Sequence, residues 1–332
     1  MGDNTSYCHC SSCTSAASSY GGSLAGTIVH FLNDVYDVIE PRIAETNRDE
    51  IFLSFLAYYE YEQAPTGINC NDHVGVIVAP IQADYNEAIN SAKNYSDYGS
   101  LFSGWSNVCS RVDTWLYETN FQNYLYPLNT FKATTDSIKY LASLGSINVI
   151  YTQGQHNVTA YRTGFNALKK YLNSKFMIDP SSDYDELVDK FFAHYYGEGG
   201  ETMRTFFNQM VDRLEYNEAN HSDILYQNNR KCVGQNIANA SLWSFSELQS
   251  WVALCDTAMS MTSSATYRKN ILSESIFPRF ALCTLFANQY SSSDLNALRT
   301  AFKNDCDSLG ITRYKEANAS TLQSDYYDDW GL

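Results

Sequence analysis

The stretch from Val112 to Gly154 constrains the fold of this chain more than any other. A short β-branched and aromatic run begins at Val112, residues 130–144 have helical periodicity, and a second short apolar run begins at Ile147. This succession predicts a strand, a helix and a second strand that form one β-α-β unit. Because parallel strands need such a crossover, the sequence predicts an α/β fold with a parallel sheet.

Polar and aromatic side chains gather directly after each of these two predicted strands. Tyr117, Glu118 and Asn120 follow the first strand, and Gln153 and His156 follow the second. In parallel α/β folds, ligands bind at the carboxyl ends of the strands. We therefore expect a binding or catalytic site to include these residues.

Two earlier apolar runs, residues 51–57 and 74–79, predict two further strands that are covered on both faces. The first run is followed by a polar and aromatic segment that contains Tyr58, Glu60 and Glu62. Strands, loops and helices alternate at intervals of roughly 25–40 residues, as in parallel α/β proteins. The sequence has no G-x-G-x-x-G and no Walker-type loop, which are the usual signatures of nucleotide binding.

After Gly154 the periodicity predicts helices only. The predicted helices comprise residues 163–173, 184–194, 201–216, 246–261, 266–290 and 293–309, with Ser246 and Ser293 as N-caps and Pro278 as a kink or break. The expected organisation is a partial (β/α) part over residues 1–160, a helical domain over residues 161–315 and a frayed acidic tail over residues 316–332. An amphipathic helix over residues 24–39 precedes the first strand.

The chain is acidic, with 37 Asp and Glu against 22 Lys and Arg and a formal net charge of −15. This balance repels nucleic acid and anionic membranes, so neither is an expected partner. No apolar run is long enough to span a bilayer, and Met1 leads directly into polar sequence without a signal peptide. The 26 Tyr, 17 Phe and 5 Trp residues suit sugar-binding clefts, and they suit an aromatic core equally well.

Cys8, Cys10 and Cys13 form a C-x-C-x-x-C motif near the N-terminus. Three thiolates and one further ligand complete the tetrahedral site of a soft metal such as a structural zinc, with His9 or Cys70 as the candidate fourth ligand. The same cysteines also suit a disulfide within the loop, or free and packed thiols. The other cysteines are scattered singly, and several lie in apolar helical contexts where cysteine packs as a small hydrophobic residue. We expect no other cofactor.

Five short motifs follow one another along the chain. They are Asp3-Asn4 with Cys8, Cys10 and Cys13; Leu56-Ala57-Tyr58 with Pro65; Trp115, Tyr117, Asn120, Phe121, Tyr124, Leu125 and Pro127; Gln153-Gly154; and Tyr195-Tyr196-Gly197. In this order they resemble the bacterial glycoside-hydrolase-like family DUF4838, a domain of unknown function whose relatives include α-glucuronidases. The resemblance extends from Asp3 to about Ile311, which is nearly the whole chain.

The resemblance implies a TIM-type (β/α)8 barrel followed by an all-α helical domain. Family members have a longer N-terminal part, so this chain would hold the C-terminal half of the barrel, with strands that correspond to about the fourth to the eighth. A half barrel exposes an apolar sheet edge. The resemblance therefore implies either a fragment or a barrel that another chain completes. The full-length protein would be extracellular or at the cell surface.

The function that the resemblance implies is a glycoside hydrolase that acts on a complex glycan or polysaccharide through two carboxyl groups at the strand ends. The catalytic candidates are Glu118, Asp3 and Glu60, and Glu118 is expected to point into the mouth of the barrel. Asp3-Asn4 is placed like the Asp-Glu pair of hexosaminidase-type barrels, but Asn4 cannot donate a proton as a carboxylic acid does.

The expected ligand is a carbohydrate, held by aromatic rings and by polar side chains at the strand ends. The predicted substrate-binding residues are Trp115, Tyr117, Asn120, Tyr58, Gln153 and His156, with His194 as a further candidate for a sugar hydroxyl. The alternative function is that of a non-catalytic carbohydrate-binding module or an inactive, truncated remnant.

Overall fold

The computed structural model describes residues 7–45, 51–155, 163–316 and 320–332. The chain divides into two compact units. The first unit comprises Met1–Tyr117 and Asp136–Gln153, and it holds the sheet, so we call it the sheet unit. The second comprises Glu118–Thr135 and Gly154–Leu332, and we call it the helical unit.

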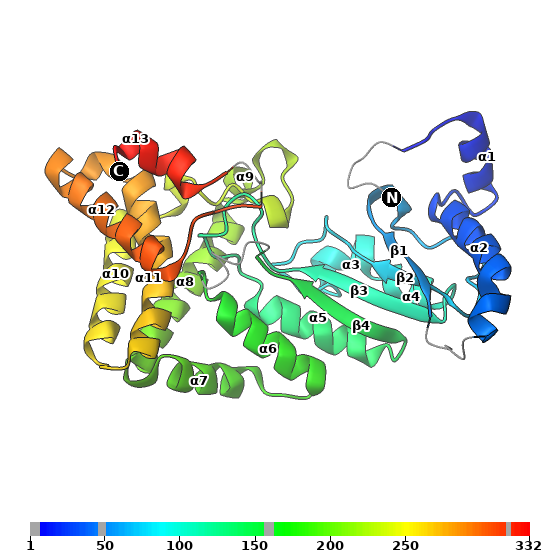
Figure 1. Ribbon diagram of the computed structural model, residues 1–332, viewed down its shortest axis with the longest axis horizontal. Helices are drawn as coiled ribbons and strands as arrows, with labels where there is room; N and C mark the ends of the chain where they lie inside the picture. Colours follow the sequence, from blue (N-terminus) through cyan, green and yellow to red (C-terminus); the bar gives the residue numbers. More distant parts are fainter. Residues whose placement is uncertain (1–6, 46–50, 156–162, 317–319) are drawn as a thin grey trace. The chain divides into compact units, whose positions relative to one another are not determined.

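The sheet unit is built on four parallel strands (Figure 1). They are β1 (Leu53–Ala57), β2 (Val74–Val78), β3 (Arg111–Tyr117) and β4 (Ile147–Gln153), hydrogen-bonded in the order β1-β2-β3-β4. Each strand thus lies beside the one that precedes it in the chain. This confirms the predicted α/β class and the four strands expected from the apolar runs.

The two faces of this sheet differ in burial. Side chains alternate between the faces of a strand, and one set is buried: Phe55 and Ala57, Val74, Val76 and Val78, Val112, Thr114 and Leu116. The opposite set, which we call the open face, comprises Leu56, Ile77, Trp115, Val149 and Tyr151. Val149 and Tyr151 keep 46% and 47% of their surface exposed. The expectation that β1 is covered on both faces was therefore wrong, because only one of its faces is buried.

Helices α2 (Ala25–Glu45) and α4 (Leu101–Ser106) pack against the sheet, α2 on β1 and β2 and α4 on β3. Helix α2 is longer than the predicted helix and continues through Pro41. The other helices of this part are α1 (Ser11–Ser18), the 3₁₀ turn η1 (Tyr59–Tyr61), α3 (Ala92–Tyr98) and, from Asp136 onward, α5 (Phe131–Ser143). Gly21 and Gly22, with φ angles of 70° and 87°, turn the chain between α1 and α2 in a conformation that glycine adopts without strain.

A disulfide joins Cys70 and Cys109, whose Cα atoms are 4.9 Å apart. The two cysteines lie in the loops that precede β2 and β3, and the backbone N–H of Cys70 donates to the carbonyl of Val108 at 2.8 Å. The sequence shows both as singly spaced cysteines and predicts no bond between them. Nothing in the sequence pairs two cysteines 39 positions apart, because their proximity arises from the adjacency of two strands.

We expect the Cys70→Ser/Cys109→Ser double variant to lose about 2–4 kcal/mol of unfolding free energy in the sheet unit, since the bridge restricts the unfolded chain. Urea unfolding followed by the fluorescence of Trp105 and Trp115 measures this loss. Reductant should lower the free energy of unfolding of the wild-type protein by the same amount and leave that of the double variant unchanged. Identical wild-type curves with and without reductant would contradict the prediction.

The helical unit confirms the predicted largely helical region after the sheet. Its elements are α6 (Asn166–Ile178), α7 (Tyr184–Tyr195), η2 (Gly197–Gly199), α8 (Gly200–Asn220), α9 (Ser222–Leu225), η3 (Gln227–Asn229), η4 (Cys232–Gly234), η5 (Ala240–Leu242), α10 (Phe245–Ser260), α11 (Ala265–Leu285), η6 (Ala287–Gln289), α12 (Ser292–Leu309), the π-helical η7 (Gln323–Tyr327) and α13 (Asp328–Trp330). Aromatic rings form much of its core, with Phe165 in contact with Phe206 and Phe207 at ring-centroid distances of 5.3 and 5.1 Å.

Three details of the helical prediction need correction. The N-caps of α10 and α12 are Ser244 and Ser291, two residues before the serines expected, because those hydroxyls accept the free N–H groups of the first turn. Pro278 lies inside α11 without dividing it. Residues 320–332 of the tail are not frayed, since Leu322 and Tyr327 are buried.

Candidate functional site

The carboxyl end of β1 carries a tight aromatic and acidic turn. Tyr58 follows the strand, its ring lies 4.2 Å from that of Tyr59, and Glu60 is exposed in the 3₁₀ turn η1. Tyr59 has a φ of 51°, a left-handed conformation that a residue with a Cβ adopts only under strain. The predicted residues Tyr58 and Glu60 thus lie together at one strand end.

The open face brings together a second group of predicted residues. The indole N–H of Trp115 donates to Oε1 of Gln153 at 2.9 Å, and the Trp115 ring lies 4.3 Å from that of Tyr151. Tyr117 is only 6% exposed, and its ring packs edge to face against Tyr85. Sequence reasoning missed Tyr151, although its position two residues before Gln153 in a strand puts both side chains on one face.

Glu118 begins the helical unit and is enclosed within it, with 2% of its surface exposed. Nδ2 of Asn173 donates to its Oε2 at 2.5 Å. Nζ of Lys169 donates to the backbone carbonyls of Glu118 and Leu128 at 2.8 and 2.7 Å. Lys169 and Asn173 lie one helical turn apart on α6, and sequence reasoning missed both because nothing local to Glu118 points to that helix.

Burial shifts the pKa values of both Glu118 and Lys169. Desolvation raises the pKa of Glu118, while the charge of Lys169 and the hydrogen bond from Asn173 act against that rise. Burial lowers the pKa of Lys169 to about 8, and the neighbouring Glu118 partly offsets this. A carboxyl group with a raised pKa is suited to donate a proton.

The space beside Glu118 is small. The adjoining cavity, lined also by Asn120, Gln155 and Lys169, measures about 10 Å³, which admits one water molecule at most and no sugar ring. Asn120 is buried there, and its Nδ2 donates to the carbonyl of Gln235 at 3.0 Å. In this conformation the Glu118 carboxyl group is within reach of a single water only.

A larger pocket of about 370 Å³ lies between α6 and α7 of the helical unit. Its walls are aromatic, with the ring of Phe191 stacked on Tyr195 at 4.6 Å and 5.5 Å from Tyr171. Lys190 and the exposed His194 supply its polar groups. The volume is that of a small-molecule site, and aromatic walls with a few polar groups are typical of one. The helical periodicity shared by Phe191, His194 and Tyr195 could have suggested this cluster.

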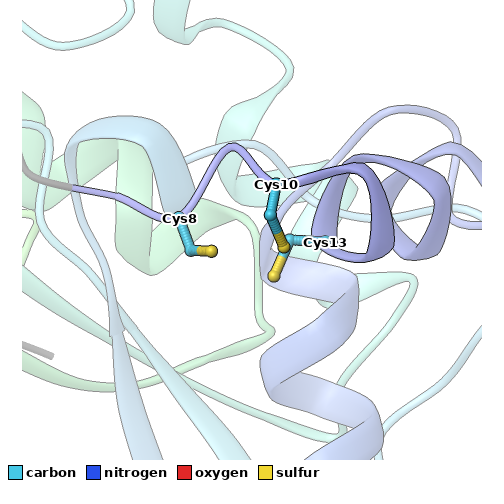
Figure 2. Close-up of side chains that lie close together, drawn as sticks. All are labelled: Cys8, Cys10 and Cys13. Atoms are coloured by element: carbon cyan, nitrogen blue, oxygen red, sulfur yellow. The ribbon is translucent and has the colours of Figure 1, made fainter.

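The three N-terminal thiols converge in the sheet unit. Cys8 lies on the segment before α1, Cys10 is the N-cap of that helix, and Cys13 lies in its first turn (Figure 2). Their sulfur atoms lie within 4.8 Å of one another. Hydrogen bonds from the Cys13 backbone and from the other two thiols lower the pKa of Cys10 to about 7, while those to Cys8 and Cys10 raise the pKa of Cys13 to about 11. Burial raises the pKa of Tyr61, and the thiols of Cys13 and Cys8 add to this rise.

Asp3, Asn4 and His156 lie outside the described residues. Asp113 lies early in β3, away from its carboxyl end, and forms an ion pair with Arg111 at 3.2 Å. Cys70 cannot serve as the fourth ligand of the thiol cluster while it is bonded to Cys109.

A parallel sheet with aromatic and acidic side chains at its strand ends, followed by a largely helical region, makes this chain an α/β protein. Its sequence matches the family described as Domain of unknown function (DUF4838) over residues 1–208, and the chain belongs to that family. No curated protein and no solved structure matches it. Among the helices that the structure describes, none is long and apolar enough to cross a membrane.

Proposed function

We propose that this protein is a glycoside-hydrolase-like protein that acts on a complex glycan or polysaccharide through carboxylates at the strand ends. The observation that carries the proposal is the turn after β1, where Tyr58 and Tyr59 stand beside the exposed carboxylate of Glu60. Ring faces suit stacking on sugars, and an accessible carboxylate suits acid-base work at a glycosidic bond. Trp115 and Tyr151 extend the aromatic surface on the open face.

We propose further that the sheet corresponds to half of a (β/α)8 barrel. In a barrel each strand is added beside its predecessor, whereas the strand order of a doubly wound sheet reverses at one point. The order β1-β2-β3-β4 without reversal supports the barrel. The open face would then be the interior of the barrel, and further strands, from this protein or another chain, would pair with β1 and β4.

The proposed location is extracellular or at the cell surface. The Cys70–Cys109 disulfide supports it, since such bonds form and persist in oxidising compartments. The net charge of −15 supports an uncharged glycan over nucleic acid as the partner.

The first test is a screen of aryl glycosides and polysaccharides for turnover. On a substrate that is cleaved, we expect Glu60→Gln to lower turnover by at least about 100-fold, the scale of general acid-base catalysis, because glutamine cannot transfer the proton. The melting temperature should not change, since Glu60 is exposed. Glu118→Gln is the matched variant. If it loses turnover at an unchanged melting temperature and Glu60→Gln does not, the chemistry belongs to Glu118 instead.

A second function, glycan binding without hydrolysis, is favoured by the enclosure of Glu118 and by the aromatic pocket around His194. Glycan binding measured by calorimetry, with no turnover of any substrate in the screen, would support it. His194→Ala and Tyr171→Ala should then weaken binding, while Met177→Ala, at an exposed position on α6 outside the pocket, should not.

A further inference from the structure

We propose that Cys8, Cys10 and Cys13 bind one soft, thiophilic metal ion, Zn²⁺, and leave its fourth coordination position open to an exogenous ligand. The inference stands on the positions of the three sulfur atoms. It holds whether or not the protein cleaves a glycan.

The sulfur geometry is close to that of a bound zinc ion. Two sulfurs on one tetrahedral zinc, each about 2.3 Å from the metal, are about 3.8 Å apart. The three sulfur atoms here already lie within 4.8 Å of one another. Each pair therefore needs to approach by about 1 Å at most. Cys8 and Cys10 are exposed and Cys13 is half-buried, so rotation of surface side chains suffices.

The local backbone gathers these thiols. Cys10 has the extended conformation of an N-cap, and the N–H of Thr14 bonds to its carbonyl at 2.9 Å, which starts α1. Cys13 lies three residues after Cys10 and returns to the same side of the helix start, while Cys8 reaches it from the preceding segment (Figure 2). Three sulfurs thus meet at the positive end of a helix, where negative charge is stabilised.

Packing in the core does not explain why these surface thiols lie close together. The buried cysteines of this chain, such as Cys255 and Cys306, have 0% of their surface exposed and fill core positions. Cys8 and Cys10 fill none. A divalent cation would draw the three thiolates together and release their protons.

The fourth coordination position of the metal distinguishes this site from a structural zinc site. Among the described residues, no further His, Cys, Asp or Glu offers a ligand atom to this cluster. His9 lies between Cys8 and Cys10 in the sequence but does not join it, and Cys70 is held in its disulfide. Three protein ligands and an open position characterise zinc sites that bind a water or a substrate, while structural sites are closed by four protein ligands.

The test is metal titration of the metal-free full chain, with Cys8, Cys10 and Cys13 as thiols and the Cys70–Cys109 disulfide retained, against a chromophoric zinc chelator, with elemental analysis of the product. We expect one Zn²⁺ per chain. Each single Cys→Ser change in the cluster should weaken binding by more than about 100-fold, since loss of even an outer-shell partner weakens a site about 10- to 100-fold. Cys232→Ser, at a buried cysteine of the helical unit that is in no disulfide, and His9→Ala are the controls and should bind as the wild type does.

Cobalt substitution tests the open position. Co²⁺ in the site should give thiolate charge-transfer bands and tetrahedral ligand-field bands that shift on addition of imidazole or cyanide. Three results would overturn the inference: less than half an ion per chain, a disulfide between two of the three cysteines as the only state found by mass spectrometry, or unshifted cobalt spectra. An equal loss of affinity in His9→Ala would show a closed site instead.

Discussion

Glu274→Gln is expected to keep its stability as the pH rises from about 5 to about 8, while the wild-type protein loses several kcal/mol of unfolding free energy over the same range. Glu274 lies on α11 in the core of the helical unit, with 1% of its surface exposed. Its carboxyl group accepts hydrogen bonds from the N–H of Phe165 at 2.7 Å and from the hydroxyl of Tyr196 at 3.1 Å. Burial nevertheless raises its pKa to about 8.

The direction of the effect follows from proton linkage. Between the pKa of an unfolded glutamate, about 4.3, and the folded value of about 8, the native state holds a proton that the unfolded chain has released. The stabilisation is complete below the unfolded pKa and is lost as the pH rises through the folded one, with a slope of at most about 1.4 kcal/mol per pH unit. Glutamine cannot ionise, and its amide can bond to both Phe165 and Tyr196.

Urea unfolding at a series of pH values measures the difference between the two proteins. Other titrating groups, including Lys169 and Glu118, contribute equally to both and cancel. Glu215→Gln, an exposed position on α8, is the matched control and should follow the wild type. Parallel wild-type and Glu274→Gln curves would mean that Glu274 is ionised in the folded protein at neutral pH.

The strands of the sheet could be predicted from the sequence because each is a short run of apolar residues. The runs at Val74 and Val112 are long enough to exclude a loop and too short for a helix. The open face could not be predicted. Periodicity shows which side chains share a face, as Trp115 and Tyr117 do, but not whether any element covers that face.

The environment of Glu118 in the candidate site could not be predicted from the sequence either. Its place after a strand was evident from the sequence, and so was its polar neighbourhood. Its two partners come from α6, 51 and 55 residues further along the chain. Only the fold brings them together. The same local sequence pattern, an acidic residue after a strand, therefore belongs to an enclosed carboxylate at Glu118 and to an exposed one at Glu60.

Replacement of Lys169 by methionine is expected to destabilise the helical unit by about 3–5 kcal/mol. Methionine keeps most of the apolar stem but removes the ammonium group that lies 4.9 Å over the ring of Phe131 and donates to the carbonyls of Glu118 and Leu128. Both carbonyls then lose that donor, and the enclosed carboxyl group of Glu118 loses the cation that acts on it most strongly. Lys269→Met, at an exposed position on α11, should change stability by less than about 0.5 kcal/mol.

A double variant separates the loss of the Lys169 charge beside Glu118 from the loss of its hydrogen bonds to the two backbone carbonyls. Glu118→Gln removes the negative charge and retains an acceptor for Asn173, so Lys169→Met should be less damaging in that background, by about 1–3 kcal/mol. Urea unfolding of the wild type, the two single variants and the double variant gives this coupling energy directly. Strictly additive losses would show that the charges of Glu118 and Lys169 do not interact, and that Lys169 acts only as a donor to the two backbone carbonyls.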